Sequence, residues 1–231
     1  MPPLNLVGDF GGGGMFLAFG ILAAHLSALR TGEGQVVDAA MVDGAAYLMA
    51  PIFGLHSAGG WGEGRGTNLL DGGAPWYGVY ATADDRYMAV GAIERRFYDE
   101  LIDKLGLAGE TLPEQHDRAG WPLLRARFAA AFKARTQAEW QAVFAASDAC
   151  VAPVLSLGEA PHHPHNRDRA TFLERDGVIE PAPAPRLSRT PAAAGHPPHR
   201  TGADSEAVLA GWGFSAAEIE RLRSEGVIGC A

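Results

Sequence analysis

Asp9 and Glu94 are the two carboxylates whose surroundings in the sequence favour chemistry. Asp9 stands just before four consecutive glycines, residues 11–14, and an apolar stretch that is expected to be helical. Free N–H groups and the dipole at a helix start favour negative charge, so Asp9 would stay ionised and could act as a base or a nucleophile. Aspartate is also a common helix N-cap, and the spacing alone leaves both roles open.

Glu94 follows an apolar strand expected at 87–92 and precedes another predicted helix. The end of a strand is a usual place for an active-site group, whereas an acid in the first turn of a helix can simply complement the helix dipole. The residues alone leave both roles open. Nearby, Trp76 and Tyr77 could line a pocket for an acyl chain or adenine. Alternatively, their side chains pack in the core.

The glycines at 11–14 predict that a ligand comes close to the backbone, but they match neither GxGxxG nor the P-loop. The histidines and cysteines predict no metal site. His25 is expected as a core group on a buried helix, and Cys150 as a small core residue with no base beside it. Five further histidines are separated by prolines in a spacing that fits no zinc site; they are interpreted as solvated loop residues: His162, His163, His165, His196 and His199.

The elements that must position Asp9 are apolar and closely spaced. Residues 15–29 are apolar on nearly every face, which predicts a helix buried from all sides. This helix is expected to end at Arg30, before glycines. Residues 35–39 are predicted as a strand and 41–55 as a second helix, an order typical of α/β proteins.

The elements around Glu94 indicate a small α+β domain over residues 77–160, after an irregular, glycine-rich linker at 56–76. Strands at 79–82 and 87–90 flank a turn and predict a hairpin. Three helices follow, the last opened by a Thr136–Glu139 capping box. Residues 150–155 return as a strand, placed at a sheet edge by Pro153.

The remaining residues form two predicted segments. Residues 161–200 hold most of the prolines and are interpreted as an extended linker. Residues 201–231 are expected to return to a larger domain, and Ser215 with Glu218 forms a second capping box that opens a helix.

Composition restricts the class of protein. With 231 residues, 47% of them hydrophobic, the chain can form one or two globular domains. A formal net charge of −8 argues against a general nucleic-acid binder. Two cysteines without CxxC spacing fit a reducing, cytoplasmic location. The apolar run at 15–29 is shorter than the ~20 residues that cross a bilayer, so no membrane span is expected.

Taken together, six segments resemble the alpha-methylacyl-CoA racemases, members of the family III CoA-transferase superfamily. The resemblance covers essentially the whole chain, and the glutamate after Ala-Val-Gly-Ala-Ile at 89–93 points to racemases within it. The segments are PLNLVGDFGGG (3–13), TGEGQVVDA (31–39), NLLDGGAP (68–75), YMAVGAIE (87–94), DACVAPV (148–154) and GFS (213–215).

The resemblance implies a fold and a reaction. The fold is α/β, with a Rossmann-like large domain, to which residues 1–55 contribute a C-terminal part, and a small α+β domain. The reaction interconverts (2R)- and (2S)-2-methylacyl-CoA thioesters by removing and returning the α-proton, with no metal or redox cofactor. The expected partners are the acyl-CoA substrate, of fatty-acid or related type, and a second copy in an interlocked dimer.

The resemblance also implies roles for residues. Asp9 would serve one face of the planar intermediate, and Glu94 would pair with a histidine that serves the other. The histidine's position lies upstream of residue 3, so the chain is expected to be a fragment, a truncated frame or one piece of a split enzyme. The predicted substrate-binding residues are Asn5, Gly11, Gly12, Leu70 and Tyr77.

Two other interpretations are kept. The first is a CoA-transferase of the same superfamily in which Asp9 is the nucleophile that forms anhydride and thioester intermediates. The second is a non-catalytic subunit, which the missing histidine favours and the retained Asp9 and Glu94 oppose.

Overall fold

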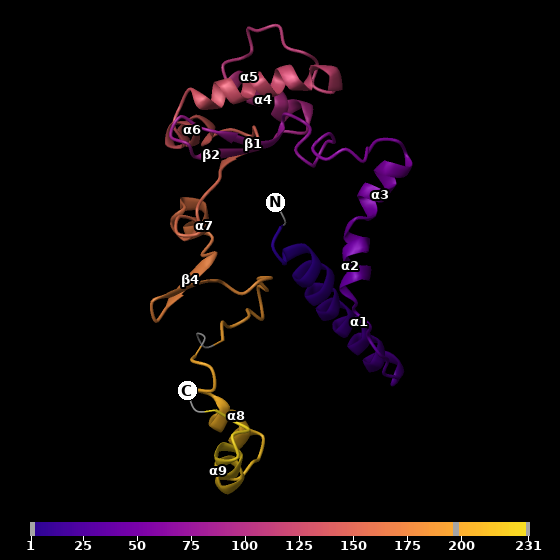
Figure 1. The fold of residues 1–231 in the computed structure, drawn as a ribbon, viewed down its shortest axis with the longest axis vertical. Helices are drawn as coiled ribbons and strands as arrows, with labels where there is room; N and C mark the ends of the chain where they lie inside the picture. Colours follow the sequence, from indigo (N-terminus) through magenta and orange to yellow (C-terminus); the bar gives the residue numbers. More distant parts are fainter. Residues whose placement is uncertain (1–2, 196–198, 230–231) are drawn as a thin grey trace. The chain divides into compact units, whose positions relative to one another are not determined.

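The computed structural model describes residues 3–195 and 199–229 (Figure 1). The chain divides into two compact units, the first ending at Val154 and the second beginning at Leu155. The two units are described separately.

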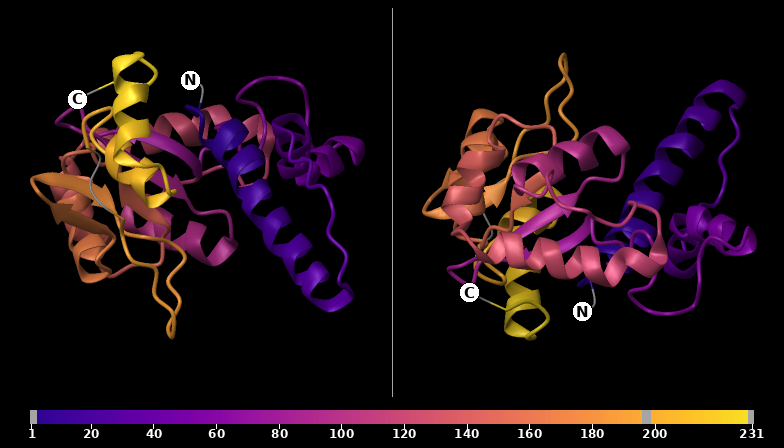
Figure 2. Two further views of the ribbon diagram at one scale, coloured as in Figure 1. Left: turned by 90° about the horizontal axis from the view of Figure 1, so that it is seen from below. Right: turned by 90° about the horizontal axis from the view of Figure 1, so that it is seen from above.

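The first unit begins with two helical elements in succession. A π-helix, η1 (Leu6–Met15), leads directly into α1 (Phe16–Thr31), which both views in Figure 2 show as one uninterrupted helix. The helix ends where Gly32 adopts a left-handed conformation, with φ of 80°, and donates its N–H to Ala28 O at 2.8 Å. Glycine takes this conformation without a Cβ clash, so the predicted glycine stop is confirmed.

The expected burial of the apolar helix is not found. None of the residues of α1 is buried, and Phe19 is 72% exposed. The helical stretch Leu6–Thr31 also has 26 residues, more than the expected apolar run, because η1 extends it towards the N-terminus. By length and composition alone it could cross a membrane, but the same test is passed by core helices of soluble proteins and by signal sequences.

The predictions for residues 35–55 are partly wrong. Residues 35–39 form no regular element and pair with no strand of the described chain, and Val36 is 94% exposed. A strand needs neighbouring N–H and C=O groups to pair with. The predicted second helix is divided into α2 (Met41–Leu48) and α3 (Ala50–Ser57). Pro51 causes the break, since it lacks an N–H and its ring would clash with the Tyr47 carbonyl in a continuous helix.

A three-stranded antiparallel sheet follows, in the order β1 (Tyr77–Ala81), β2 (Tyr87–Gly91) and β3 (Val151–Pro153). Val79 pairs with Ala89, and Ala89 pairs in turn with Ala152. The predicted hairpin and the edge position of β3 are both confirmed.

The helices of this unit are α4 (Arg95–Lys104), the short η2 (Arg118–Gly120), α5 (Trp121–Lys133) and α6 (Gln137–Phe144). Figures 1 and 2 show α4 and α5 on the same side of the sheet. The Thr136–Glu139 capping box opens α6 as predicted. Large side chains with no more than 2% exposure form the core between helices and sheet: Trp76, Met88, Leu101, Leu124, Phe128, Phe132 and Trp140.

The second unit contains more secondary structure than the extended linker predicted at 161–200. Its elements are η3 (Ala160–His162), α7 (Pro164–Asp168), β4 (Phe172–Arg175), β5 (Val178–Pro181), α8 (Ser205–Gly211) and α9 (Ala216–Ser224). Strands β4 and β5 form an antiparallel hairpin. Its turn is Asp176–Gly177, both with positive φ, a sequence typical of a tight hairpin turn, which the predicted linker did not take into account. The Ser215 capping box opens α9 as predicted.

Candidate functional site

Asp9 lies within η1 and not before a helix start. The helix begins at Leu6, so Asp9 is in its first turn and the glycines continue the helix. The N-cap is Asn5, whose side chain makes no capping hydrogen bond. Both side chains are exposed. The N-cap alternative for Asp9 is therefore wrong, and Asp9 is instead the acidic residue of the first helical turn.

Gly11 and Gly12 lie where η1 packs against α2. Gly12 is buried, and a Cβ on it would lie 2.8 Å from the Ala45 backbone nitrogen. A Cβ on Gly44 would overlap the Gly12 carbonyl oxygen. Backbone therefore meets backbone at this crossing, and the contact gives Gly12 a packing role in addition to the predicted role in substrate binding.

Glu94 is the N-cap residue of α4 and has extended backbone angles, φ −72° and ψ 141°. Its carbonyl oxygen accepts the Phe97 and Tyr98 N–H groups, both at 3.0 Å, but its side chain makes no capping bond. The carboxylate is exposed. The backbone of Glu94 thus starts the helix and leaves its carboxylate available for another function.

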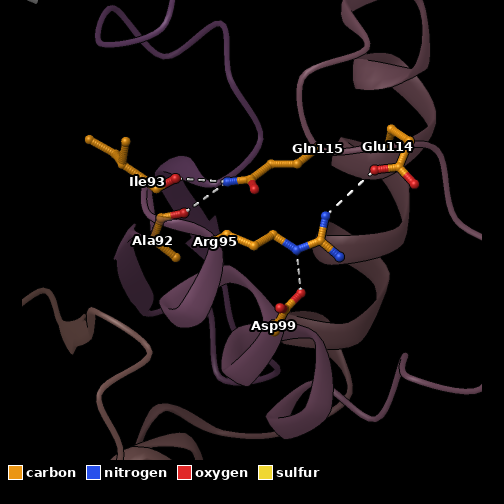
Figure 3. A network of polar contacts seen from close by, with 6 residues as sticks. All are labelled: Ala92, Ile93, Arg95, Asp99, Glu114 and Gln115. Atoms are coloured by element: carbon orange, nitrogen blue, oxygen red, sulfur yellow. Dashed lines mark hydrogen bonds and ion pairs between the residues drawn. The ribbon is translucent and has the colours of Figure 1, made fainter.

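The residues on either side of Glu94 are held by Gln115 and Glu114, which precede η2, and by Asp99 of α4 (Figure 3). Gln115 Nε2 donates to Ile93 O at 2.9 Å and to Ala92 O at 3.4 Å. On the other side, Arg95 Nε donates to Asp99 Oδ1 at 2.7 Å, and Arg95 Nη1 lies 3.5 Å from Glu114 Oε2. No pattern in the sequence had marked Gln115, because its partners are backbone carbonyls 22 and 23 residues away.

Leu70 and Tyr77, both predicted to bind substrate, line one open hollow of about 420 Å³ on the sheet. Cys150 lines it too, and is exposed instead of being the predicted core residue. Desolvation, followed by the negative charge of Glu94, raises the pKa of the Cys150 thiol. The thiol is therefore protonated at neutral pH.

The other predicted pocket residue, Trp76, is fully buried. Its ring packs edge-on against Tyr98, His116 and Trp121 at centroid distances of 5.3–5.7 Å. The packing alternative is thus the observed one for Trp76, while Tyr77 faces the hollow.

The loop that carries Leu70 is held by a set of hydrogen bonds that the sequence analysis does not predict. Asn68, 1% exposed, donates to Asp71 Oδ2 at 2.9 Å and to Gly62 O at 3.0 Å. Arg125 of α5 donates to the Gly72 and Gly73 carbonyl oxygens at 2.6 and 2.9 Å. Asn and Asp among glycines do signal a hydrogen-bonded turn, and this signal could have identified the loop as ordered.

The charge of Asp71 is favoured in this loop. Desolvation alone would raise the Asp71 pKa, but hydrogen bonds from the Asn68 side chain and from the Asn68 and Gly73 backbone outweigh it and hold the pKa below its usual value. A carboxylate that accepts several N–H groups is stabilised in its ionised form.

Histidines and carboxylates form no metal-binding cluster among the described residues. His25 is exposed and not the predicted core residue. His199 contacts Asp204 at 2.8 Å. His196 and Cys230 lie outside the described residues. Asp9 and Glu94 lie on separate elements, η1 and the N-cap of α4.

Comparison with known proteins gives a consistent result. A sequence profile described as CoA-transferase family III matches residues 3–205. An alpha-methylacyl-CoA racemase of Mus musculus is 47% identical over 98% of this chain, and that of Homo sapiens is 45% identical over 98%. The chain spans 60% of the length of each. An acetyl-CoA:oxalate CoA-transferase of Acetobacter aceti is 28% identical over 76% of this chain, which spans 46% of its length.

Solved structures share the fold. Rv3272 of Mycobacterium tuberculosis superposes with a TM-score of 0.63 at 23% identity, over 84% of this chain and 51% of that one. A CaiB/BaiF family protein of Brucella suis gives 0.62 at 17% identity, over 87% of this chain and 54% of that one. These comparisons confirm the predicted α/β fold.

Proposed function

Because this chain belongs to CoA-transferase family III, we propose that it acts on acyl-CoA thioesters and interconverts (2R)- and (2S)-2-methylacyl-CoA. The observation that carries the proposal is the 45–47% identity to two alpha-methylacyl-CoA racemases over 98% of the chain. The chain spans 60% of those relatives, so the proposal concerns the activity to which these residues contribute.

The chemistry requires two proton-transfer groups and a stabilised oxygen. Breaking the α-C–H bond sends its proton to a base and leaves an enolate, whose charge must be stabilised at the thioester oxygen. Return of a proton to the opposite face gives the other epimer. Asp9, in the first turn of η1, would serve one face, and Glu94 would support the histidine that serves the other.

The hollow lined by Leu70 and Tyr77 supports an apolar substrate group. Its remaining walls are small or apolar residues of the sheet, among them Val79 and Val90. Such walls suit a branched acyl chain better than a charged carboxylate, since burying an unpaired charge is costly. Asn5, Gly11 and Gly12 would lie at the end of the site that Asp9 occupies.

The further parts of the proposal concern the setting of the reaction. Proton transfer at the α-carbon needs neither a metal nor a redox cofactor, and coenzyme A arrives as part of the substrate. The proposed location is the cytoplasm, and the proposed assembly is an interlocked homodimer, with acyl-CoA of fatty-acid type as the substrate.

Transfer of CoA between carboxylic acids is the alternative function, favoured by the 28% identity to the acetyl-CoA:oxalate CoA-transferase. In that reaction the Asp9 carboxylate would attack the thioester carbonyl and release the CoA thiolate, which would attack the Asp9 carbonyl of the resulting anhydride and expel the first acid as its carboxylate. The acceptor carboxylate would attack the Asp9–CoA thioester and release the thiolate again. The thiolate would then attack the acceptor's carbonyl in this second anhydride, which gives the new acyl-CoA and the free Asp9 carboxylate. Glu94 has no part in that sequence, so its substitution separates the two reactions.

The test is proton NMR of (2R)-2-methylacyl-CoA in heavy water with the purified chain. We expect loss of the α-proton signal and appearance of the 2S epimer, and a decrease of about 10²-fold or more in Glu94→Gln, a typical loss for acid–base groups. CoA transfer from the same thioester to added oxalate, unchanged in Glu94→Gln, would support the alternative. If neither reaction is observed, the purified chain alone has neither activity.

A further inference from the structure

The turn that carries Glu94 is held from one side by a buried side chain. Gln115 is 2% exposed, and its Nε2 donates to the carbonyl oxygens of Ala92 and Ile93, the two residues directly before Glu94. The path from β2 into α4 turns at these residues. Without Gln115 the carbonyl of buried Ala92 and that of half-buried Ile93 would lose this donor, which costs free energy.

Gln115 is itself fixed from behind. The indole N–H of Trp121, at the start of α5, donates to the Gln115 carbonyl oxygen at 3.0 Å. Trp121 is 8% exposed and belongs to the aromatic core. A continuous series of contacts therefore leads from α5 through Gln115 to the residue before Glu94.

The polar contacts on the other side of Glu94 are weaker. Arg95 is exposed, with 64% of its side chain accessible, and so are its partners Asp99 and Glu114. Exposed ion pairs contribute little, because solvent screens them and the long side chains lose entropy on pairing. Figure 3 shows the contacts of Gln115 with Ala92 and Ile93, and the contact of Arg95 with the neighbouring Glu114.

We propose that Gln115 is a positioning residue for the reaction: it fixes the backbone at Ala92 and Ile93 and thereby the direction in which the Glu94 carboxylate projects. This inference rests on the proposed function, in which Glu94 supports proton transfer. Small displacements of a catalytic group lower kcat strongly, so the two donated bonds of Gln115 control catalysis without contact to the substrate.

The first test is hydrogen exchange of the whole chain, which needs no substrate. Gln115→Met retains the length of the side chain and removes its donors. We expect amide exchange in peptides covering residues 92–98 to become about tenfold faster or more, because the loss of one hydrogen bond corresponds to up to about that factor and the substitution removes two. Unchanged exchange there would overturn the proposal. Arg95→Ala, which removes only the exposed contacts, should leave these peptides nearly unchanged.

Gln137 provides a matched control. It is fully buried, and its Nε2 donates to two backbone carbonyls, Tyr87 O at 2.7 Å and Val154 O at 3.0 Å, at the opposite end of β2. Gln137→Met should therefore accelerate exchange near residues 87 and 154 and not at 92–98. An identical pattern in both variants would mean general loosening of the unit and would contradict a specific role of Gln115.

The second test separates positioning from the proposed function. In the α-proton exchange assay, Gln115→Met should lower kcat about tenfold with little change in KM, and should have no further effect in a Glu94→Gln background. An equal loss in both backgrounds would overturn action through Glu94. If Glu94→Gln alone retained full activity, the proposed role of Glu94 in proton transfer would be contradicted. The hydrogen-exchange test would then still show whether Gln115 fixes the turn.

Gln115→Glu covers the case in which the methionine variant does not fold. Its carboxyl group can donate to Ile93 O only when protonated, and as a carboxylate it would repel both carbonyls. Exchange at 92–98, compared with the parent chain at each pH, should be near normal at acidic pH and faster at neutral pH. A difference from the parent that did not change with pH would contradict the assigned hydrogen bonds.

Discussion

At the scale of single residues, the charged groups with the most hydrogen bonds are not the predicted catalytic ones. Glu94 and Asp9 are exposed, whereas Asp71 accepts four N–H groups: Gly66 N, Asn68 N, Asn68 Nδ2 and Gly73 N. These bonds shape the loop that presents Leu70 to the hollow. Asp71 therefore serves the site through the backbone that it organises.

The hydrogen bonds of Asp71 predict a pH dependence of stability. Because they lower the Asp71 pKa in the folded chain, the stabilisation is present above the ordinary aspartate pKa of about 3.9 and is lost as the pH falls through the lower folded value. Asp71→Asn places an NH₂ group against N–H donors and should lower the unfolding temperature at pH 7. The difference from the parent chain should shrink towards pH 3.

Thermal unfolding followed by tryptophan fluorescence between pH 3 and 7 measures this effect, at about 2–4 °C for each kcal/mol lost. Asp103→Asn is the control, because the Asp103 side chain is exposed and its carboxylate lies 4.0 Å from Lys104 Nζ, a weak contact. A constant difference between Asp71→Asn and the parent chain over the whole pH range would contradict the prediction.

At the scale of secondary-structure elements, the close approach of η1 and α2 determines where the Asp9 segment lies. A glycine on each helix allows backbone contact, and any Cβ at Gly44 would enter the space of the Gly12 carbonyl. Residue 54 offers a contrast, since a Cβ there would meet nothing within 4 Å although Gly54 lies inside α3.

The two glycines predict opposite effects of the same substitution. Gly44→Ala should destabilise the packing of η1 on α2 by about 1–3 kcal/mol, the usual cost of an overpacked contact. Gly54→Ala should be neutral or stabilising by up to about 1 kcal/mol, because alanine favours the helix. Hydrogen exchange of peptides from η1 and α2 measures both, and equal effects of the two variants would refute the contact.

At the scale of the whole molecule, burial is concentrated in one part of the chain. The connected core lies between Ala74 and Ala149, and the second unit has one fully buried apolar residue among those described, Ile219. In η1, α1, α2 and α3 most apolar side chains are exposed. The sheet and the helices α4 to α6 are thus the part of the chain with its own hydrophobic core.

This uneven burial predicts a local response to a core substitution. Phe128→Ala removes a fully buried ring that packs against Tyr80 and Tyr98, and should cost about 3–5 kcal/mol. Hydrogen exchange should accelerate across residues 74–149 and not in α9. Phe214→Ala is the control, because its ring in the second unit is 41% exposed, and it should change exchange in the core little. If Phe128→Ala accelerated exchange equally in both units, the prediction that the core of the first unit unfolds separately would be contradicted.

Local signals in the sequence were enough for the hairpin of β1 and β2, the helices α4 to α6, both capping boxes and the glycine stop of α1. These features depend on residues a few positions apart, so hydrophobic period, turn residues and caps specify them directly. The resemblance in the six quoted segments identified the family for the same reason, because the motifs are contiguous.

Only the tertiary structure determined what depends on distant residues. The strand expected at 35–39 has no partner to pair with, α1 has no core around it in the described chain, and Gln115 reaches the turn before Glu94 across 22 residues. One hollow is likewise lined by Leu70, Tyr77 and Cys150 because β1, β2 and β3 pair in one sheet. Burial and backbone hydrogen bonds between separate segments are set by packing, which local residue patterns do not contain.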